Sequence, residues 1–199
     1  ELLENNISEN PLELFQKWFT QVEKNAKEEV NAMTLSTIGL DGFPKARIVL
    51  LKKYSAQGFV FFTNYSSEKG KAMEVNSNVC LSFFWESMER QVIIKGQVHK
   101  ISEVESAEYF RSRPKGSQIG AMISNQSAVI PSREFLDHQL QQATVDFAHK
   151  DVEKPINWGG YIVVPQEIEF WQGRENRLHD RIRYQLSSDK SWKLDRLSP

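Results

Sequence analysis

The chain has 199 residues, 40% of them hydrophobic and 12 of them phenylalanine, which is enough apolar material for one substantial core in a single domain spanning 1–199. Its 25 basic and 26 acidic residues leave a formal net charge of −1, so no overall field directs it to nucleic acid or to an anionic membrane. One cysteine excludes an intrachain disulfide, no apolar run approaches the ~18 residues of a membrane span, and no signal peptide is recognised, which predicts a cytoplasmic protein.

Local signals place the helices and strands. Asn10 followed by Pro11 is a typical helix start. Asp41-Gly42 is a strong hairpin-turn signal, and the run 102–105 fits a capping box. In chain order we expect a helix over 10–27, strands over 32–40, 44–53 and 58–63, a helix over 66–76, strands over 79–85 and 91–101, helices over 102–113, 116–124 and 132–149, and strands over 158–164, 168–171, 178–186 and 192–197.

The order of these elements predicts the fold class. Strands outnumber helices, and most neighbouring strands are joined by tight turns rather than by βαβ crossovers. This favours a mainly β fold with added α-helices, in which an antiparallel barrel is decorated by helices. Only 150–155 has the composition of a linker, and it is too short to indicate a second domain.

The run 170–181, with the sequence FWQGRENRLHDR, is the most informative stretch of the chain. On an extended strand Arg177, His179 and Arg181 project to one face, because side chains alternate. Two guanidiniums around an imidazole repel one another, so gathering them favours an anionic partner. A solvated edge strand is the plain alternative. The aromatic pair and the glycine that precede the cluster favour a site for an anionic, planar ligand.

The run Arg47-Ile48-Val49-Leu50-Leu51-Lys52 has the pattern of a buried strand with a cation at each end. The two cations differ in parity, so a regular strand directs them to opposite faces. Either a bulge re-aims one of them or they serve two different ligands. Ordinary cations at the ends of a strand are an equally good interpretation.

Two further runs suit a phosphate. The turn 63–69 joins a strand to a helix, and free N–H groups at a helix start together with Lys69 can hold a phosphate, although a simple N-cap is the plainer interpretation. Tyr109 and Arg113 share a helix face, and Ser117 begins the next helix, which forms a second possible clamp. Alternatively, Arg113 is only a cation at the C-terminal end of the helix, where it interacts favourably with the helix dipole.

Uncharged polar residues complete the set of candidates. Gln91, Gln126 and Ser127 are of the type that the edge of a flavin ring needs, although singly they carry little information. Trp171, beside the basic run, is a candidate to pack on a ligand. The four histidines lack the spacing of metal ligands, and no G-x-S-x-G elbow is present, so we expect no metal site and no hydrolytic triad.

Together these runs closely resemble the pyridoxine (pyridoxamine) 5′-phosphate oxidase family from about Pro11 to Pro199. The resemblance rests on many ordered motifs, which are far more specific together than any one alone. They are the runs 47–52, 89–92, 109–114, 117–121, 126–127, 158–161, 169–173, 177–181 and 195–199.

The resemblance implies a split β-barrel homodimer with FMN bound where the two subunits meet. It implies oxidation of pyridoxine 5′-phosphate and pyridoxamine 5′-phosphate to pyridoxal 5′-phosphate, with O₂ as the electron acceptor and H₂O₂ as the product. The positions that match cofactor contacts are Arg47, Ile48, Val49, Leu50, Leu51, Lys52, Phe62, Thr63, Lys69, Gln91, Gln126, Ser127, Trp171 and Arg181.

By the same resemblance the substrate phosphate is held by Lys52, Tyr109, Arg113 and Ser117. Arg177 and His179 match the residues that lie over the pyridine ring, which makes them the candidate catalytic and substrate-binding residues.

The chain departs from the family pattern in two places. Position 68 is Glu where many members carry a basic residue, so the FMN phosphate is expected to depend more on Arg47, Lys69 and Ser67. Residues 1–10 contain no Arg or Lys, which gives no basis for predicting a lid.

Two alternatives to the oxidase stay open. A flavin reductase or a flavin-binding split barrel explains only the FMN positions and leaves the clamp Tyr109, Arg113 and Ser117 without a role. A carrier binds pyridoxal 5′-phosphate without turnover, and a yellow purified protein argues against a pure carrier.

Overall fold

The computed structural model describes residues 2–25 and 29–199. Its elements, in chain order, are η1 (Glu4–Asn6), α1 (Pro11–Asn25), β1 (Ala32–Ile38), β2 (Pro44–Leu50), β3 (Lys53–Ser55), β4 (Gly58–Asn64), α2 (Glu68–Val75), β5 (Asn78–Trp85), η2 (Glu86–Met88), β6 (Arg90–Lys100), α3 (Glu103–Ser112), α4 (Lys115–Ile123), α5 (Arg133–Asp146), β7 (Trp158–Gln172), η3 (Glu175–Arg177), β8 (Asp180–Leu186) and β9 (Trp192–Leu197).

The strands form one curled antiparallel sheet. Their order is β2-β1-β5-β6-β7-β4-β3, with β8 paired to β7 and β9 paired to β8. The long strand β7 pairs with β6 along most of its length, with β4 in its first half and with β8 in its second half. Because β7 changes partner midway, the sheet divides around it and curls. The predicted mainly β, antiparallel barrel with helices is confirmed.

The largest errors in the predicted strand bounds concern β7 and β2. The strands expected over 158–164 and 168–171 are one continuous strand, β7. Pro165 interrupts the sequence pattern, but it pairs with Gly96 next to a shift in register between Lys95 and Gly96. A proline lacks the N–H that a ladder needs and is tolerated at such a bulge. The strand expected over 44–53 divides into β2 and β3, and Lys27, where the first helix was expected to end, lies outside the described residues.

The main core lies where α1 packs against the inner face of the curled sheet. Asn10 caps α1 as expected, because its side-chain oxygen accepts the N–H of Leu12 at 3.0 Å. The buried ring of Phe15 lies 5.1 Å from the ring of Phe59 on β4 and 5.4 Å from that of Phe83 on β5. One helix side chain thus joins two strands that are distant in the sheet order, which holds the barrel closed on this side.

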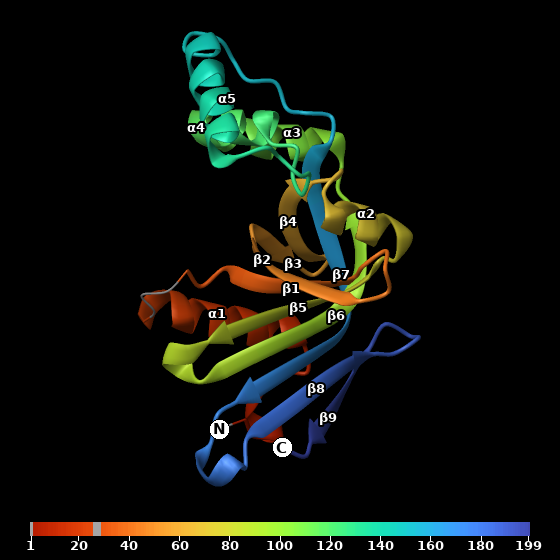
Figure 1. Cartoon of the computed structure of the whole chain (residues 1–199). Coiled ribbons are helices and arrows are strands. Elements are labelled where there is room, and N and C mark those ends of the chain that lie inside the picture. The colour runs from red at the N-terminus through yellow and green to blue at the C-terminus, as the bar shows by residue number, and fades with distance from the viewer. Residues whose placement is uncertain (1, 26–28) are drawn as a thin grey trace.

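Helices α3, α4 and α5 gather at one end of the molecule, while β8 and β9 lie at the other end (Figure 1). The predicted capping box at the start of α3 is confirmed, with reciprocal contacts between Ser102 and Glu105. A second apolar cluster joins the helices to the barrel and contains Phe110, Ile119, Ala143, Val152 and Trp158. Within the described part of the chain, the helices are too short or too polar to span a membrane.

Candidate functional site

One cavity brings the two predicted phosphate-binding runs together. It has a volume of about 810 Å³ and lies between β2, β4, the first turn of α2 and the helices α3 and α4. A volume of this size is in the range of small-molecule and cofactor sites. Of the residues named from the sequence, the wall includes Arg47, Ile48, Val49, Leu50, Lys52, Phe62, Thr63, Lys69, Tyr109, Arg113, Ser117 and Gln126.

The first group of polar residues in the cavity surrounds Lys69. Lys69 is 9% exposed, and its ammonium donates to the side-chain oxygens of Gln126 at 3.0 Å and Thr63 at 3.3 Å. Burial, and to a smaller extent the nearby positive charge of Arg47, lowers the pKa of Lys69 to about 8. A buried cation with a lowered pKa gains from an anionic partner, so this group is suited to a phosphate.

The plainer interpretation of the turn 63–69, a simple N-cap, is confirmed at Ser67. The Ser67 hydroxyl caps α2 by accepting the N–H of Gly70 at 3.3 Å, and it donates to the carbonyl of Asn64 at 2.7 Å. These bonds use the fully buried hydroxyl, and the expected support of a phosphate by Ser67 stays a prediction. At position 68, the Glu68 carboxylate pairs with Lys45 on β2 at 2.6 Å, so it neutralises a cation close to the cavity.

The second group of polar residues centres on Arg113. Its guanidinium lies over the Trp158 ring, with Cζ 4.8 Å from the ring centroid. Nη1 of Arg113 is buried and has no hydrogen-bond partner among the described residues. Burial also lowers the pKa of this group. A buried guanidinium N–H without a partner is costly, and an anion in the cavity would satisfy it.

The wall around Arg113 is a stack of aromatic rings. Tyr109 stacks on Phe62 with 3.9 Å between ring centroids, and Phe62 in turn stacks on Trp158 at 5.5 Å. Tyr109 lies on α3 and Arg113 directly follows this helix, while Ser117 lies in the first turn of α4. The stack therefore fixes one side of the clamp predicted from the sequence, and all three of its members reach the cavity.

Arg47 and Lys52 reach the same cavity despite their different parity. Strand β2 ends at Leu50 and β3 begins only at Lys53, so the chain leaves the regular strand between the two cations. The interruption of the strand therefore brings both cations to one cavity, although a regular strand would direct them to opposite faces. Arg47 is held in place by Nη1, which donates to Thr37 Oγ1 at 2.8 Å and to the Leu35 carbonyl at 3.2 Å.

The described cavity wall contains four cations and no carboxylate: Arg47, Lys52, Lys69 and Arg113. Two of these are buried or half-buried in separate places, with Arg113 on the aromatic stack and Lys69 beside Gln126. The arrangement fits two separate anionic groups around an apolar centre. Sequence reasoning missed part of the wall, namely Asn64, Pro114, Gly120, Ala121, Ser124 and Trp158.

Two other predicted cofactor residues lie beside the cavity rather than in its wall. The Leu51 side chain is buried in the main core, and its N–H donates to the Asn31 carbonyl at 2.8 Å. Ser127 follows Gln126 in a left-handed conformation, with φ of 73°, and is exposed. Their predicted contacts with a cofactor stay predictions.

The remaining predicted cofactor residues form a row on the outer face of the sheet. Gln91 on β6 pairs with Trp171 on β7, and Trp171 pairs with Arg181 on β8. Arg181 also pairs with Glu169, with Nε 2.8 Å from Oε1. Trp171 and the cavity residue Trp158 lie at the two ends of β7, about 40 Å of extended strand apart. Within one chain, the row is therefore separate from the cavity.

The expectation that Arg177 and His179 share a strand face with Arg181 was wrong. Strand β8 begins only at Asp180, and Arg177 ends the short helix η3. Asn176 and Arg177 have φ of 56° and 63°, a left-handed conformation that is uncommon for residues other than glycine. The loop that carries Arg177 and His179 stands next to the row, since the His179 ring centroid is 4.8 Å from that of Trp171.

Comparisons with known proteins identify the family and the fold of the chain. The family described as pyridoxamine 5′-phosphate oxidase matches residues 19–145, and the pyridoxine 5′-phosphate oxidase C-terminal dimerisation region matches residues 158–199. Among solved structures, PhzG from Burkholderia lata 383, in complex with tetrahydrophenazine-1-carboxylic acid, superposes with a TM-score of 0.93 at 24% identity, covering 100% of this chain and 98% of that one. An FMN-binding protein from Nostoc punctiforme, related to pyridoxamine 5′-phosphate oxidase, has a TM-score of 0.77 at 11% identity and covers 96% and 98%. These two likenesses show the fold.

Three curated relatives, each called a pyridoxine/pyridoxamine 5′-phosphate oxidase, align with the whole chain. The protein from Flavobacterium johnsoniae is 62% identical over 199 residues, and that from Flavobacterium psychrophilum is 62% identical over 200 residues. The protein from Nostoc sp. is 50% identical over 198 residues. The alignments cover 100% of this chain and 93%, 94% and 92% of the relatives, respectively. The chain therefore belongs to the pyridoxine/pyridoxamine 5′-phosphate oxidase family of oxidoreductases.

Proposed function

We propose that the whole chain is one FMN-binding domain that oxidises pyridoxine 5′-phosphate and pyridoxamine 5′-phosphate to pyridoxal 5′-phosphate. The observation that carries the proposal is a single cavity with two separate cationic groups, one around Lys69 and one at Arg113. A flavin mononucleotide and a phosphorylated substrate bring one phosphate each, and the names of the relatives agree with this chemistry. The cytoplasmic location stays a prediction.

The group around Lys69 would hold FMN. Arg47 and Lys69 would bind its phosphate, with Thr63 and Gln126 beside them, and the backbone of 48–51 would line its ring. The unpaired charge and the lowered pKa at Lys69 support this fit. The chemistry that FMN supplies is acceptance of a hydride from C4′ and return to the oxidised form through O₂, which yields H₂O₂.

The group around Arg113 would hold the substrate phosphate. Arg113 offers a buried N–H without a partner, and Tyr109, Ser117 and Lys52 offer further donors in the same wall. The phosphate is distant from the reacting carbon C4′. Binding energy at Arg113 can therefore orient that carbon rather than only retain the substrate.

A second copy of the chain would complete the site. The row of Gln91, Trp171 and Arg181 lies far from the cavity of its own chain, and the C-terminal dimerisation region matched at 158–199 includes the last two. Phe84 on β5 pairs with Gln91 on β6 and is 60% exposed, so an exposed aromatic ring extends the row. Exposed aromatic surface beside predicted ligand contacts favours cover by another subunit. The row of one copy would close the cavity of the other.

The loop carrying Arg177 and His179 would act on the reacting end of the substrate. His179 Nδ1 accepts the backbone N–H of Arg174 at 3.1 Å, so the neutral imidazole carries its proton on Nε2. That N–H and the Arg177 guanidinium can both hydrogen-bond the C4′ substituent. Left-handed backbone at non-glycine residues often accompanies a functional role, which supports the same assignment for Arg177.

Turnover by the flavin-loaded protein tests this function. With pyridoxamine 5′-phosphate or pyridoxine 5′-phosphate under O₂, we expect pyridoxal 5′-phosphate absorbance to grow together with H₂O₂. Oxidation of a nicotinamide cofactor by free flavin, without pyridoxal 5′-phosphate formation, would instead indicate a flavin reductase. Binding of pyridoxal 5′-phosphate by a colourless protein without turnover would indicate a carrier.

FMN affinity is expected to fall as the pH rises above about 8. A phosphate binds the protonated form of Lys69, whose pKa in the free protein is about 8, and the bound phosphate raises that pKa. Between the two pKa values the dissociation constant should increase about tenfold per pH unit. Flavin fluorescence titrations between about pH 7 and about pH 9.5 measure this.

The matched control is Lys69→Arg, because a guanidinium stays charged over this range. Its FMN affinity is expected to be nearly independent of pH. A dissociation constant of the unmodified protein that stays flat through this range would show that Lys69 does not hold the phosphate.

A further inference from the structure

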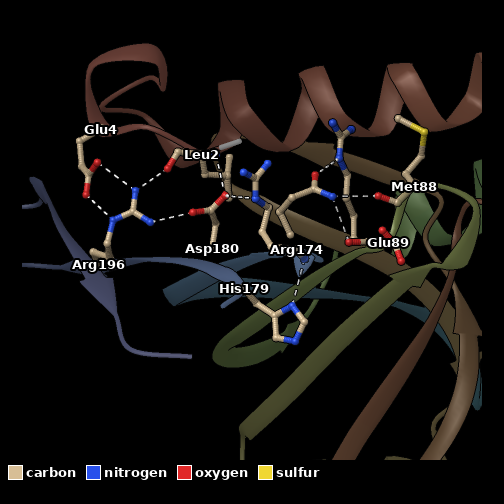
Figure 2. A network of polar contacts seen from close by, with 10 residues as sticks. Leu2, Glu4, Met88, Glu89, Arg174, His179, Asp180 and Arg196 are labelled. Carbon is tan, nitrogen blue, oxygen red and sulfur yellow. Dashed lines mark hydrogen bonds and ion pairs between the residues drawn. The ribbon is translucent and has the colours of Figure 1, made fainter. Parts of the chain in front are cut away.

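Residues 2–4 are attached to β8 and β9 by a connected group of ion pairs and hydrogen bonds (Figure 2). The Arg196 guanidinium holds the Glu4 carboxylate by two contacts, Nε to Oε1 at 2.6 Å and Nη2 to Oε2 at 2.9 Å. The same Nη2 donates to the Leu2 carbonyl. A two-point contact of this kind is the preferred geometry of arginine with a carboxylate. It holds the pKa of Glu4 down at about 2, so the carboxylate is ionised near neutral pH.

Asp180 joins this attachment to the loop that precedes it. Its Oδ1 accepts from Arg196 Nη1 at 3.0 Å, while its Oδ2 accepts the Leu2 backbone N–H at 3.1 Å. Oδ2 also lies 3.9 Å from Nε of Arg174. The Asp180 side chain is only 15% exposed, so water competes little for these contacts. One carboxylate therefore contacts the segment 2–4, the strand β9 and the loop 174–179.

Contacts of Arg174 with His179 and Asp180 hold the two ends of the loop 174–179 together. The Arg174 backbone N–H donates to His179 Nδ1, and the Arg174 side chain turns toward Asp180 (Figure 2). Between these ends, Asn176 and Arg177 keep a left-handed conformation. Residues other than glycine hold such a conformation only where the surrounding contacts impose it. The contacts of Arg174 with His179 and Asp180, at the two ends of the loop, are thus placed to impose the left-handed conformation of Asn176 and Arg177.

We propose that Asp180, held by Arg196 and by the segment 2–4, is a positioning residue that fixes the loop 174–179 and thereby orients Arg177 and His179 for the reaction. The inference rests on the proposed function, because it assigns a task to groups that support the same site. Asp180 itself would not touch the substrate. Glu4 and Arg196 act one step further away, by holding Asp180 and the segment 2–4 together.

The test compares three charge-removing variants in the flavin-loaded protein. Asp180→Asn keeps the shape of the side chain and is expected to lower kcat with pyridoxamine 5′-phosphate about tenfold, with KM changed less than threefold, because the phosphate clamp lies elsewhere. Glu4→Gln breaks the attachment at its exposed end and is expected to give a smaller loss of the same kind. The control Asp195→Asn breaks the Arg183–Asp195 pair, which joins the same two strands without contacting the loop, and is expected to leave kcat unchanged.

A double-mutant cycle separates positioning from general stability. If Asp180 acts through the loop, Asp180→Asn should add almost nothing in a chain that already carries Arg177→Ala and His179→Ala. Full addition of the two losses, or an equal loss in Asp195→Asn, would overturn the inference. So would unchanged kcat in both Asp180→Asn and Glu4→Gln. Should Arg177→Ala alone leave turnover intact, the role of the loop in the proposed function fails instead. If Asp180→Asn does not fold, Glu4→Gln alone carries the same comparison.

Discussion

Replacing Arg177 by alanine is expected to lower kcat/KM for pyridoxamine 5′-phosphate about 100-fold, a loss of about 3 kcal/mol of transition-state stabilisation. The proposed site places this guanidinium at the reacting end of the substrate and away from the phosphates. The protein should therefore keep its bound flavin and its oligomeric state. Steady-state kinetics, flavin absorbance and light scattering of the purified variant measure the three quantities.

The control for this variant is Lys190→Ala. Lys190 is another exposed cation with a left-handed backbone, at φ of 68°, but it lies in the turn between β8 and β9. The Lys190→Ala variant should have no effect on turnover.

For His179→Ala we expect a smaller loss than for Arg177→Ala, mainly as a higher KM, because an imidazole offers one directed hydrogen bond and a guanidinium offers several. Loss of flavin from both variants, or turnover at the unmodified rate, would show that the loop is not part of the substrate site.

Arg113→Ala is expected to weaken binding of phosphorylated substrates by about 1.5–3 kcal/mol, the range of a lost charge-assisted hydrogen bond. Unphosphorylated pyridoxine lacks the phosphate that Arg113 would contact, so its weak turnover should change little. The ratio of kcat/KM for pyridoxine 5′-phosphate to that for pyridoxine measures the contribution directly.

Two variants sharpen this result. Arg111→Ala removes an exposed cation from the last turn of α3, which Arg113 directly follows, and should leave the ratio unchanged. Arg113→Lys keeps a positive charge but loses the planar group that lies on Trp158, so it should recover only part of the ratio. Equal losses for pyridoxine and its phosphate in Arg113→Ala would mean that Arg113 serves the fold rather than the phosphate.

Local signals were sufficient for much of the fold. The asparagine cap of α1, the capping box of α3 and the alternation of the strands each depend on residues close together in the sequence, and each is confirmed. The continuity of β7 through Pro165 could not be predicted in this way. It depends on a bulge opposite Gly96 on β6, which is a feature of a partner strand far away in the sequence.

The candidate site shows the same division. Tyr109 and Arg113 were recognisable because they lie four residues apart in a predicted helix, and Ser117 because it begins the next helix. Trp158 was missed, since a tryptophan that supports a guanidinium has the same sequence pattern as one in a core. The start of β8 was predicted wrongly because the strand is preceded by two consecutive left-handed residues, Asn176 and Arg177. Neither is a glycine, the residue type that usually indicates such a conformation in a sequence. Asn176 was the only local signal, as asparagine tolerates this conformation better than most residues.

The separation of the cavity from the row on the outer face was also beyond prediction from local patterns. It follows from the length of β7, which carries Trp158 at one end and Trp171 at the other. The central claim of the account is that each active site combines the cavity of one subunit with the row and loop of its partner. The claim concerns residues that no single chain brings together.

Subunit complementation tests this claim most directly. At pyridoxamine 5′-phosphate concentrations far below KM, homodimers carrying Arg113→Ala or Arg177→Ala are each expected to keep less than about a tenth of the unmodified activity. In a mixed dimer, one of the two sites receives an unmodified cavity from one chain and an unmodified loop from the other. Co-expression in equal amounts with random pairing should therefore restore turnover of pyridoxamine 5′-phosphate to about a quarter of that of the unmodified protein. Activity of the mixture that stays at the mean of the two inactive parents, although mixed dimers are present, would contradict a site shared between subunits.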